Sequence, residues 1–186
     1  MTPAEYLAFE RQSEQKHEYY RGEIFAMAGT SLAHNRITTN LVAELRQQFR
    51  DRPCDAFVND MRTQVPSLGL YTYPDVIALC GPPEFEDDVF DTLTNPQLVV
   101  EVLSPSTESY DRGKKFQFYR QSESLTDYLL VAQNRISAEH FRRQPSGEWL
   151  LKGYTEIDDV IQIESLDCIL SLAEIYLKVE IEGDDD

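Results

Sequence analysis

The sequence predicts a mixed α/β or α+β fold in which a helix connects two buried central strands. Two nearly continuous apolar runs, at residues 98–103 and 127–132, are typical of strands that are covered on both faces. The segment 106–122 between them follows a Ser-Pro break and has the length of a helix. A right-handed crossover through this helix would make the two strands parallel. Shorter strands before and after them predict a mixed sheet flanked by helices.

The first third of the chain predicts a helix, a hairpin and a second helix. Residues 2–5 (TPAE) combine an N-cap, a first-turn proline and a capping-box acid, which predicts a helix over residues 3–12. Residues 18–27 have the pattern of two strands joined at Arg21-Gly22. The segment 31–50 predicts a longer helix, because a serine can cap it and its apolar stripe recurs every four residues. This stripe consists of Ile37, Leu41, Leu45 and Phe49.

After Pro53 the pattern changes to short strands. We expect them at residues 56–58, 61–65, 73–79, 98–103, 127–132, 137–143, 149–154 and 160–163. The last three of these strands are expected to form an antiparallel meander, and residues 172–177 a final short helix. Residues 81–95 are rich in proline and aspartate, so we expect a loop there.

The charge is concentrated in two acidic runs. The chain of 186 residues has a formal net charge of −16, and the runs at 84–91 and 180–186 contribute −5 each. We therefore expect one domain at residues 1–179 with an acidic tail at 180–186, and we expect both runs to be solvated, mobile surface. This balance excludes a strongly cationic nucleic-acid coat protein and a polybasic membrane binder.

The cysteines and the apolar runs indicate a cytoplasmic protein. Cys54, Cys80 and Cys168 have neither zinc-finger nor CxxC spacing, so we expect free, mostly buried thiols in a reducing compartment. The first residues lack the pattern of a signal peptide. No apolar run is long enough to cross a membrane.

Two carboxylates interrupt apolar strands. Glu101 lies within LVVEVL and Asp75 within YPDVIAL, where a lone charge is costly unless it is paired, hydrogen-bonded or bound to a metal. If both point the same way they suit Mg²⁺; alternatively, a backbone amide or an arginine satisfies each one separately. Lys114 or Lys115, on the following helix, could lean over them. Otherwise Asp111 and Lys115 form an ordinary i, i+4 pair on a solvated face.

Longer motifs carry a resemblance to a known family. They are PD at 74–75, VEVLSPST at 100–107, DRGKKFQFYR at 111–120, DYLLV at 127–131 and YYRGEIFAM at 19–27, with His34 opening the long helix. From about residue 3 to 165 the chain resembles a large bacterial family of candidate restriction endonucleases within the PD-(D/E)XK nuclease superfamily. The most specific part is VEVLSPST followed by D-x-x-x-K-x-x-x-Y.

The resemblance implies a three-layer restriction-endonuclease-like fold with a mixed central sheet of four to five strands. It also implies that Asp75 and Glu101 are acidic metal ligands and that the backbone carbonyl of Val102 is a third. The expected cofactor is Mg²⁺, with Mn²⁺ as a substitute. The catalytic group would be Asp75, Glu101 and a lysine.

The position of the lysine departs from the superfamily. Its usual lysine follows the glutamate by two residues, where this chain has Leu103. The resemblance moves this role to Lys115 on the next helix, with Lys114 as the neighbouring candidate. The two differ by about 100° around a helix, so only one can face the site. Glu23, as an extra metal or water ligand, and His34, as a phosphate contact or orienting group, are second-tier candidates.

The implied activity is metal-dependent endonucleolytic hydrolysis of phosphodiester bonds in DNA. The acidic charge predicts weak DNA binding, and by analogy with the superfamily a homodimer is expected. A nuclease-fold module for protein binding or regulation, with a vestigial metal site, is the alternative, and a hydrolase of small phosphoesters is a third. We find no helix-turn-helix and no aromatic-and-basic platform for single strands, and we expect Tyr20, Phe25 and the other aromatic residues in the core.

Overall fold

The computed structural model describes residues 1–181, and it contains five α-helices and three sheets within that range. The helices are α1 (Pro3–Glu10), α2 (Leu32–Phe49), α3 (Glu108–Tyr110), α4 (Phe116–Tyr119) and α5 (Leu172–Ile175). Short 3₁₀ turns, η1 (Pro66–Leu68) and η3 (Glu164–Leu166), and a π-helical turn, η2 (Asp111–Lys115), complete the helical elements. None of the described helices is long and apolar enough to cross a bilayer.

The central sheet has six strands, two of them parallel neighbours. In order across the sheet they are β11 (Trp149–Tyr154), β10 (Ala138–Arg143), β9 (Asp127–Ala132), β8 (Leu98–Leu103), β6 (Val76–Cys80) and β3 (Cys54–Val58). β8 and β9 are parallel and the other pairs are antiparallel, so the expected crossover and mixed sheet are confirmed. The expected number of four to five strands was too small, since β10 and β11 extend the same sheet to an exposed edge.

Two smaller sheets accompany it. The five-stranded sheet has the order β2 (Glu23–Ala26), β1 (His17–Tyr20), β5 (Leu70–Thr72), β4 (Arg62–Val65) and β7 (Thr92–Leu93). The third sheet pairs β12 (Val160–Ile163) with β13 (Cys168–Ser171). The meander prediction was therefore wrong for β12, which pairs with β13 because this hairpin buries Ile161, Ile163 and Leu170 beside α2.

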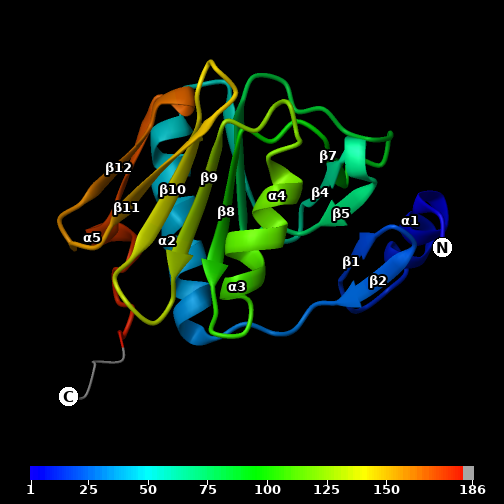
Figure 1. Cartoon of the computed structure of the whole chain (residues 1–186), viewed down its shortest axis with the longest axis horizontal. Coiled ribbons are helices and arrows are strands. Elements are labelled where there is room, and N and C mark those ends of the chain that lie inside the picture. The colour runs from blue at the N-terminus through cyan, green and yellow to red at the C-terminus, as the bar shows by residue number, and fades with distance from the viewer. Residues whose placement is uncertain (182–186) are drawn as a thin grey trace.

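The central sheet lies between α2 and the α3–η2–α4 segment, which gives three layers (Figure 1). Along β8, Val100 and Val102 pack with the apolar stripe of α2. The alternate residues Val99 and Leu103 pack with Phe118 of α4 on the opposite face. Because side chains alternate along a strand, Glu101 shares the face of Val99 and Leu103.

Local sequence patterns predicted the positions of most helices and strands correctly. Thr2 and Glu5 form the capping box of α1, and the side chain of Ser31 caps α2. β1 and β2 form the expected hairpin around Arg21 and Gly22, which both have positive φ. The predicted helix at 106–122 is instead three short pieces, because a π-helical turn separates α3 from α4. Such turns recur at functional sites in proteins.

The acidic run at 84–91 is more ordered than expected. Arg11 pairs with Asp87 at 2.7 Å and with Asp91 at 2.8 Å, and Arg62 also pairs with Asp91 at 2.8 Å. β7 and a bridge between Phe85 and Leu93 follow from this anchoring. Arginines distant in sequence thus anchor the run at Asp87 and Asp91, while most of its residues stay exposed, as expected of solvated surface. Most of the predicted tail at 180–186 lies outside the described residues.

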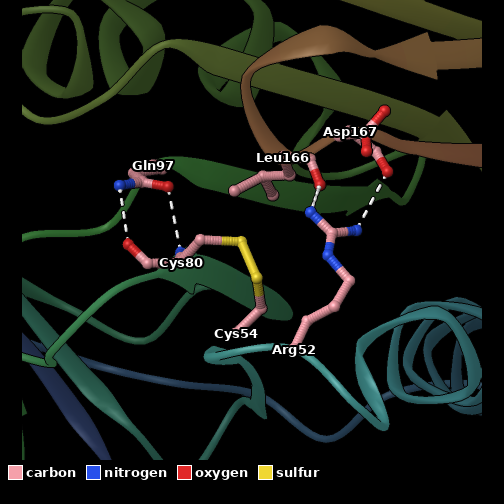
Figure 2. Close-up of a disulfide and its surroundings, with 6 residues drawn as sticks. All are labelled: Arg52, Cys54, Cys80, Gln97, Leu166 and Asp167. Atoms are coloured by element: carbon pink, nitrogen blue, oxygen red, sulfur yellow. Dashed lines mark hydrogen bonds between the residues drawn. A yellow bond between two sulfur atoms is a disulfide. The ribbon is translucent and has the colours of Figure 1, made fainter.

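The expectation of free thiols was wrong for two of the three cysteines. Cys54 of β3 and Cys80 of β6 are directly opposite in the ladder and form a disulfide (Figure 2). The side chain of Gln97 holds the backbone of Cys80 through two hydrogen bonds, of 3.0 and 3.1 Å. Cys168 is free and buried, as predicted. Spacing along the sequence could not reveal the pair, because the strand register brings the two residues together.

Candidate active-site cleft

Strand register brings the two unusual carboxylates together. Val76 of β6 pairs with Val100 of β8, so the next position along this antiparallel pair puts Asp75 opposite Glu101. Directly opposed residues project from the same face of a sheet. The backbone N–H of Val102 donates a 2.7 Å hydrogen bond to Asp75 Oδ2, which fixes that carboxylate at the end of β6. Glu101 therefore lies on the α4 side of the sheet, whereas Asp75 lies just before β6 at the edge of the sheet, within reach of His34 from α2. Both carboxylates are buried.

A cleft of about 570 Å³ opens over these carboxylates. Its ionisable side chains come from all parts of the fold: Glu18, His34, Asp75, Glu101, Asp111 and Lys115. Residues 25–31, after the hairpin, and residues 104–107, after β8, form its rim. The structure thus brings Asp75, Glu101 and Lys115 into one cleft, together with Val102.

Lys115 is surrounded by carboxylates. Its Nζ lies 2.9 Å from Glu101 Oε1, 3.4 Å from Glu18 Oε1 and 3.7 Å from Asp111 Oδ1. The i, i+4 pair with Asp111 does form, but it is buried against the sheet instead of lying on a solvated face. Burial alone would lower the pKa of Lys115; the carboxylates of Glu101 and Glu18 outweigh this and hold that pKa above its ordinary value. The lysine is therefore a buried cation at neutral pH.

Lys114 points elsewhere. Its Nζ lies 5.8 Å from the ring centre of Tyr20 and 5.7 Å from that of Phe118, and it is not among the residues that line the cleft. Of the two lysines that the sequence left open, Lys115 is the one that faces the carboxylates.

Glu101 has a second hydrogen-bond partner that we did not predict. The hydroxyl of Tyr119 donates to Glu101 Oε1 at 3.1 Å and also lies 3.3 Å from Thr72 Oγ1. Thr72 in turn donates to Glu18, so the two neighbouring hydroxyls each donate to one of the two carboxylates. Burial raises the pKa of Glu101 above its ordinary value, and Lys115 opposes this rise. The tyrosine of the D-x-x-x-K-x-x-x-Y motif was the signal for Tyr119; Glu18 had no comparable signal.

The two second-tier candidates, His34 and Glu23, differ in their relation to the cleft. His34 Nε2 lies 3.1 Å from Asp75 Oδ1, while its buried Nδ1 has no hydrogen-bond partner among residues 1–181. Glu23 is exposed at the start of β2 and does not line the cleft, where Glu18 of β1 contributes the carboxylate from the hairpin. His34 therefore contacts the site through Asp75, and Glu23 has no contact with it.

Comparisons with known proteins give consistent matches over nearly the whole chain. The family described as "Putative restriction endonuclease" (Uma2) matches residues 3–173. Two uncharacterised proteins of Synechocystis sp. are similar: sll1609 is 41% identical over 151 residues (81% of this chain, 85% of that protein) and slr1290 is 36% identical over 176 residues (95% and 91%). The fold is similar to that of a crystal structure of "a putative nuclease belonging to DUF820" from Anabaena variabilis. That match has a TM-score of 0.76 at 19% identity and covers 95% of this chain and 97% of that one. The predicted nuclease-like mixed fold is thereby confirmed.

Proposed function

Because the chain belongs to the Uma2 family of "Putative restriction endonuclease" proteins, we propose that it is a metal-dependent endonuclease that hydrolyses phosphodiester bonds in DNA. The observation that carries this proposal is the pairing of two buried carboxylates on neighbouring strands, with a buried ammonium beside them. Asp75 lies opposite Glu101, and Lys115 Nζ lies 2.9 Å from Glu101. Such a group can hold a cation and stabilise negative charge on a phosphate.

The donor set suits a hard divalent cation, because the available ligands are oxygens. We propose that Asp75, Glu101 and the main-chain carbonyl of Val102 hold Mg²⁺, for which Mn²⁺ can substitute. Within residues 1–181 no group of three or more His, Cys, Asp or Glu side chains is arranged to hold a metal ion. The proposed set has only two side-chain ligands, so the Mg²⁺ would keep several of its own waters. Bound there, it would lower the pKa of a water and offset the charge of the phosphate.

The remaining residues position and balance these groups. His34 and the N–H of Val102 contact the two oxygens of Asp75, and Tyr119 holds Glu101 by its hydroxyl. Lys115 stays protonated because of its carboxylate neighbours, so we assign it electrostatic stabilisation of the phosphate and not proton abstraction. His34 is a positioning residue in this scheme, and Lys115 is the catalytic cation.

Affinity for DNA should be low. A net charge of −16 repels phosphates, so we propose weak binding that the divalent cation strengthens. A homodimer that cuts both strands, and a cytoplasmic location, remain part of the proposal; light scattering of the purified chain tests the dimer.

A plasmid-nicking assay with Mg²⁺ or Mn²⁺ tests the activity. Asp75→Asn and Glu101→Gln should remove cleavage, and Lys115→Ala should slow it by about 10²–10³-fold, the usual cost of losing one electrostatic donor. Lys152→Ala, which removes an exposed lysine on β11, is the matched control and should cut at the wild-type rate.

Two further results would decide the proposal. Mg²⁺ should raise the unfolding temperature of the wild type and not that of Asp75→Asn, because a ligand of the folded state stabilises it. Absence of cleavage by the wild type on plasmid, single-stranded DNA and RNA would contradict a nuclease and favour the binding or regulatory module.

A further inference from the structure

A second pocket adjoins the cleft. It has a volume of about 210 Å³ and shares Glu18, Phe25 and Tyr110 with the larger cleft. The rings of Tyr20 and Phe118, whose centres lie 4.6 Å apart, line it together with Leu70 and Lys114. We call it the aromatic pocket. Because it shares a wall with the cleft, a polymer bound at the carboxylates would pass its entrance.

Two of its four aromatic residues are more exposed than a core explains. Phe25 is 48% exposed and Tyr110 is 38% exposed, although large apolar side chains are usually buried. We expected Phe25 in the core, and that expectation was wrong. The fold assembles the pocket from β1, β2, β5, α3, η2 and α4, which no local sequence pattern could reveal.

The pocket has two charged side chains, Glu18, which pairs with Lys115 at 3.4 Å, and Lys114. The side chain of Lys114 is exposed, and among the described residues its ammonium lies over the ring faces of Tyr20 and Phe118 rather than against a carboxylate. In a chain with a net charge of −16, a cation left in this position favours an anionic occupant. The pocket walls favour a flat aromatic one. A cavity of about 150 Å³ already admits a benzene ring, so 210 Å³ admits a single heterocycle.

We propose that the aromatic pocket binds one unpaired nucleobase of a DNA strand, with Lys114 on the adjacent phosphate, while the neighbouring phosphodiester lies over Asp75 and Glu101. This inference rests on the proposed nuclease function and narrows its substrate to single-stranded or locally unpaired DNA. Stacking on an aromatic side chain is worth about 1–3 kcal/mol per base and is tolerant of sequence. Extracting a paired base from a duplex costs a few kcal/mol, so a base that is already unpaired is preferred.

Binding is measured without cleavage, by fluorescence of oligonucleotides that contain 2-aminopurine, in EDTA and low salt. The wild type should bind the single strand more tightly than the matched duplex, and stacking should quench the probe. Phe25→Ala should weaken binding of the single strand by about thirtyfold, the middle of the range for one stacked base, and abolish the quenching. Lys114→Gln should weaken binding of the single strand and reduce its salt dependence.

Two control variants match these changes away from the pocket. Phe90→Ala removes a ring that is 62% exposed in the acidic run, and Lys152→Gln removes an exposed lysine on β11. Both should bind like the wild type. Equal affinity for single strand and duplex, or equal quenching by Phe25→Ala and Phe90→Ala, would overturn the inference. Phe25 and Lys114 are exposed, so both variants should fold, and circular dichroism verifies this.

Cleavage of single-stranded and duplex substrates separates this inference from the proposed function. If the wild type cuts DNA and Phe25→Ala leaves the ratio of single-strand to duplex cleavage unchanged, the pocket assignment fails and the nuclease stands. If the wild type cuts no substrate but binds the 2-aminopurine probe, and Phe25→Ala binds it more weakly, the nuclease proposal fails and the pocket still binds a base.

Discussion

Replacing Lys115 by methionine would leave Glu101 buried without its cation. The two side chains are 9% and 5% exposed and only 2.9 Å apart, so little solvent can compensate for the loss. Removing one partner of a buried ion pair costs about 3–5 kcal/mol. The hydrogen bond from Tyr119 to Glu101 remains in the variant and offsets about 1 kcal/mol of this cost. We therefore expect the free energy of unfolding to fall by about 3 kcal/mol at pH 8.

The loss should depend on pH. Burial and Asp75 raise the pKa of Glu101, and Lys115 is the main group that opposes them. In Lys115→Met the folded pKa of Glu101 therefore lies further above its unfolded value of about 4.3. The folded pKa of Glu101 is already raised in the wild type, so only between that value and the higher value in the variant does the variant alone take up a proton on folding. In this range acidification stabilises the variant relative to the wild type. The recovery is at most about 1.4 kcal/mol per pH unit in that window, and the full penalty remains above the folded pKa.

Urea unfolding followed by circular dichroism, in EDTA at pH 8 and pH 5, measures both effects. The double variant Lys115→Met/Glu101→Gln should recover much of the loss, because no buried charge remains unpaired. Lys152→Met is the surface control. A loss below about 1 kcal/mol at pH 8, on the scale of a surface pair, or an equal loss at both pH values, would refute this account of the cleft.

Two further predictions concern stability away from the cleft. Hydrogen bonds from Arg11, and then the charge of Arg62, hold the pKa of Asp91 below its usual range despite partial burial. Asp91→Asn should therefore cost about 1–2 kcal/mol at pH 7, after a discount for exposure. In thermal unfolding the difference from the wild type should shrink progressively as the pH falls below about 4, and it should disappear only below the lowered folded pKa of Asp91. A difference that does not shrink as the pH falls would contradict the pairing. The Cys54–Cys80 bond closes a loop of 26 residues in sequence separation, worth about 3.5 kcal/mol in the chain-entropy account. Dithiothreitol should lower the urea midpoint of the wild type and not of Cys54→Ser, and equal midpoints for reduced and oxidised wild type would argue against the cross-link.

Local patterns predicted the helices and most strands because their causes are local. The capping box of α1, the serine cap of α2 and the apolar runs of β8 and β9 each depend on a few neighbouring residues. β5, β7 and β13 were missed because they are short and are stabilised by distant partners. The disulfide and the ion pairs of the acidic run were also missed, because each joins residues that are distant in sequence.

The candidate site was predictable where a residue contradicted its surroundings. Asp75 and Glu101 stood out as charges within apolar strands, and their opposition follows from one register. Glu18 did not stand out, because a glutamate in a short amphipathic hairpin is ordinary. Its place beside Lys115 depends on how β1 pairs with β5, a contact across about fifty residues of chain.

The division of the site between two sheets has a mechanical consequence. Asp75 and Glu101 are held in the six-stranded sheet, whereas Phe25 lies on β2, an edge strand whose four residues are all exposed and which pairs with β1 alone. Detaching such an edge strand costs far less than unfolding the domain. β1 itself is held by the packing of Tyr19 against Tyr6 and Tyr71. The wall formed by β2 can therefore open locally at a lower free-energy cost than the strands beside the carboxylates, so adaptability and accuracy reside in different parts of the molecule.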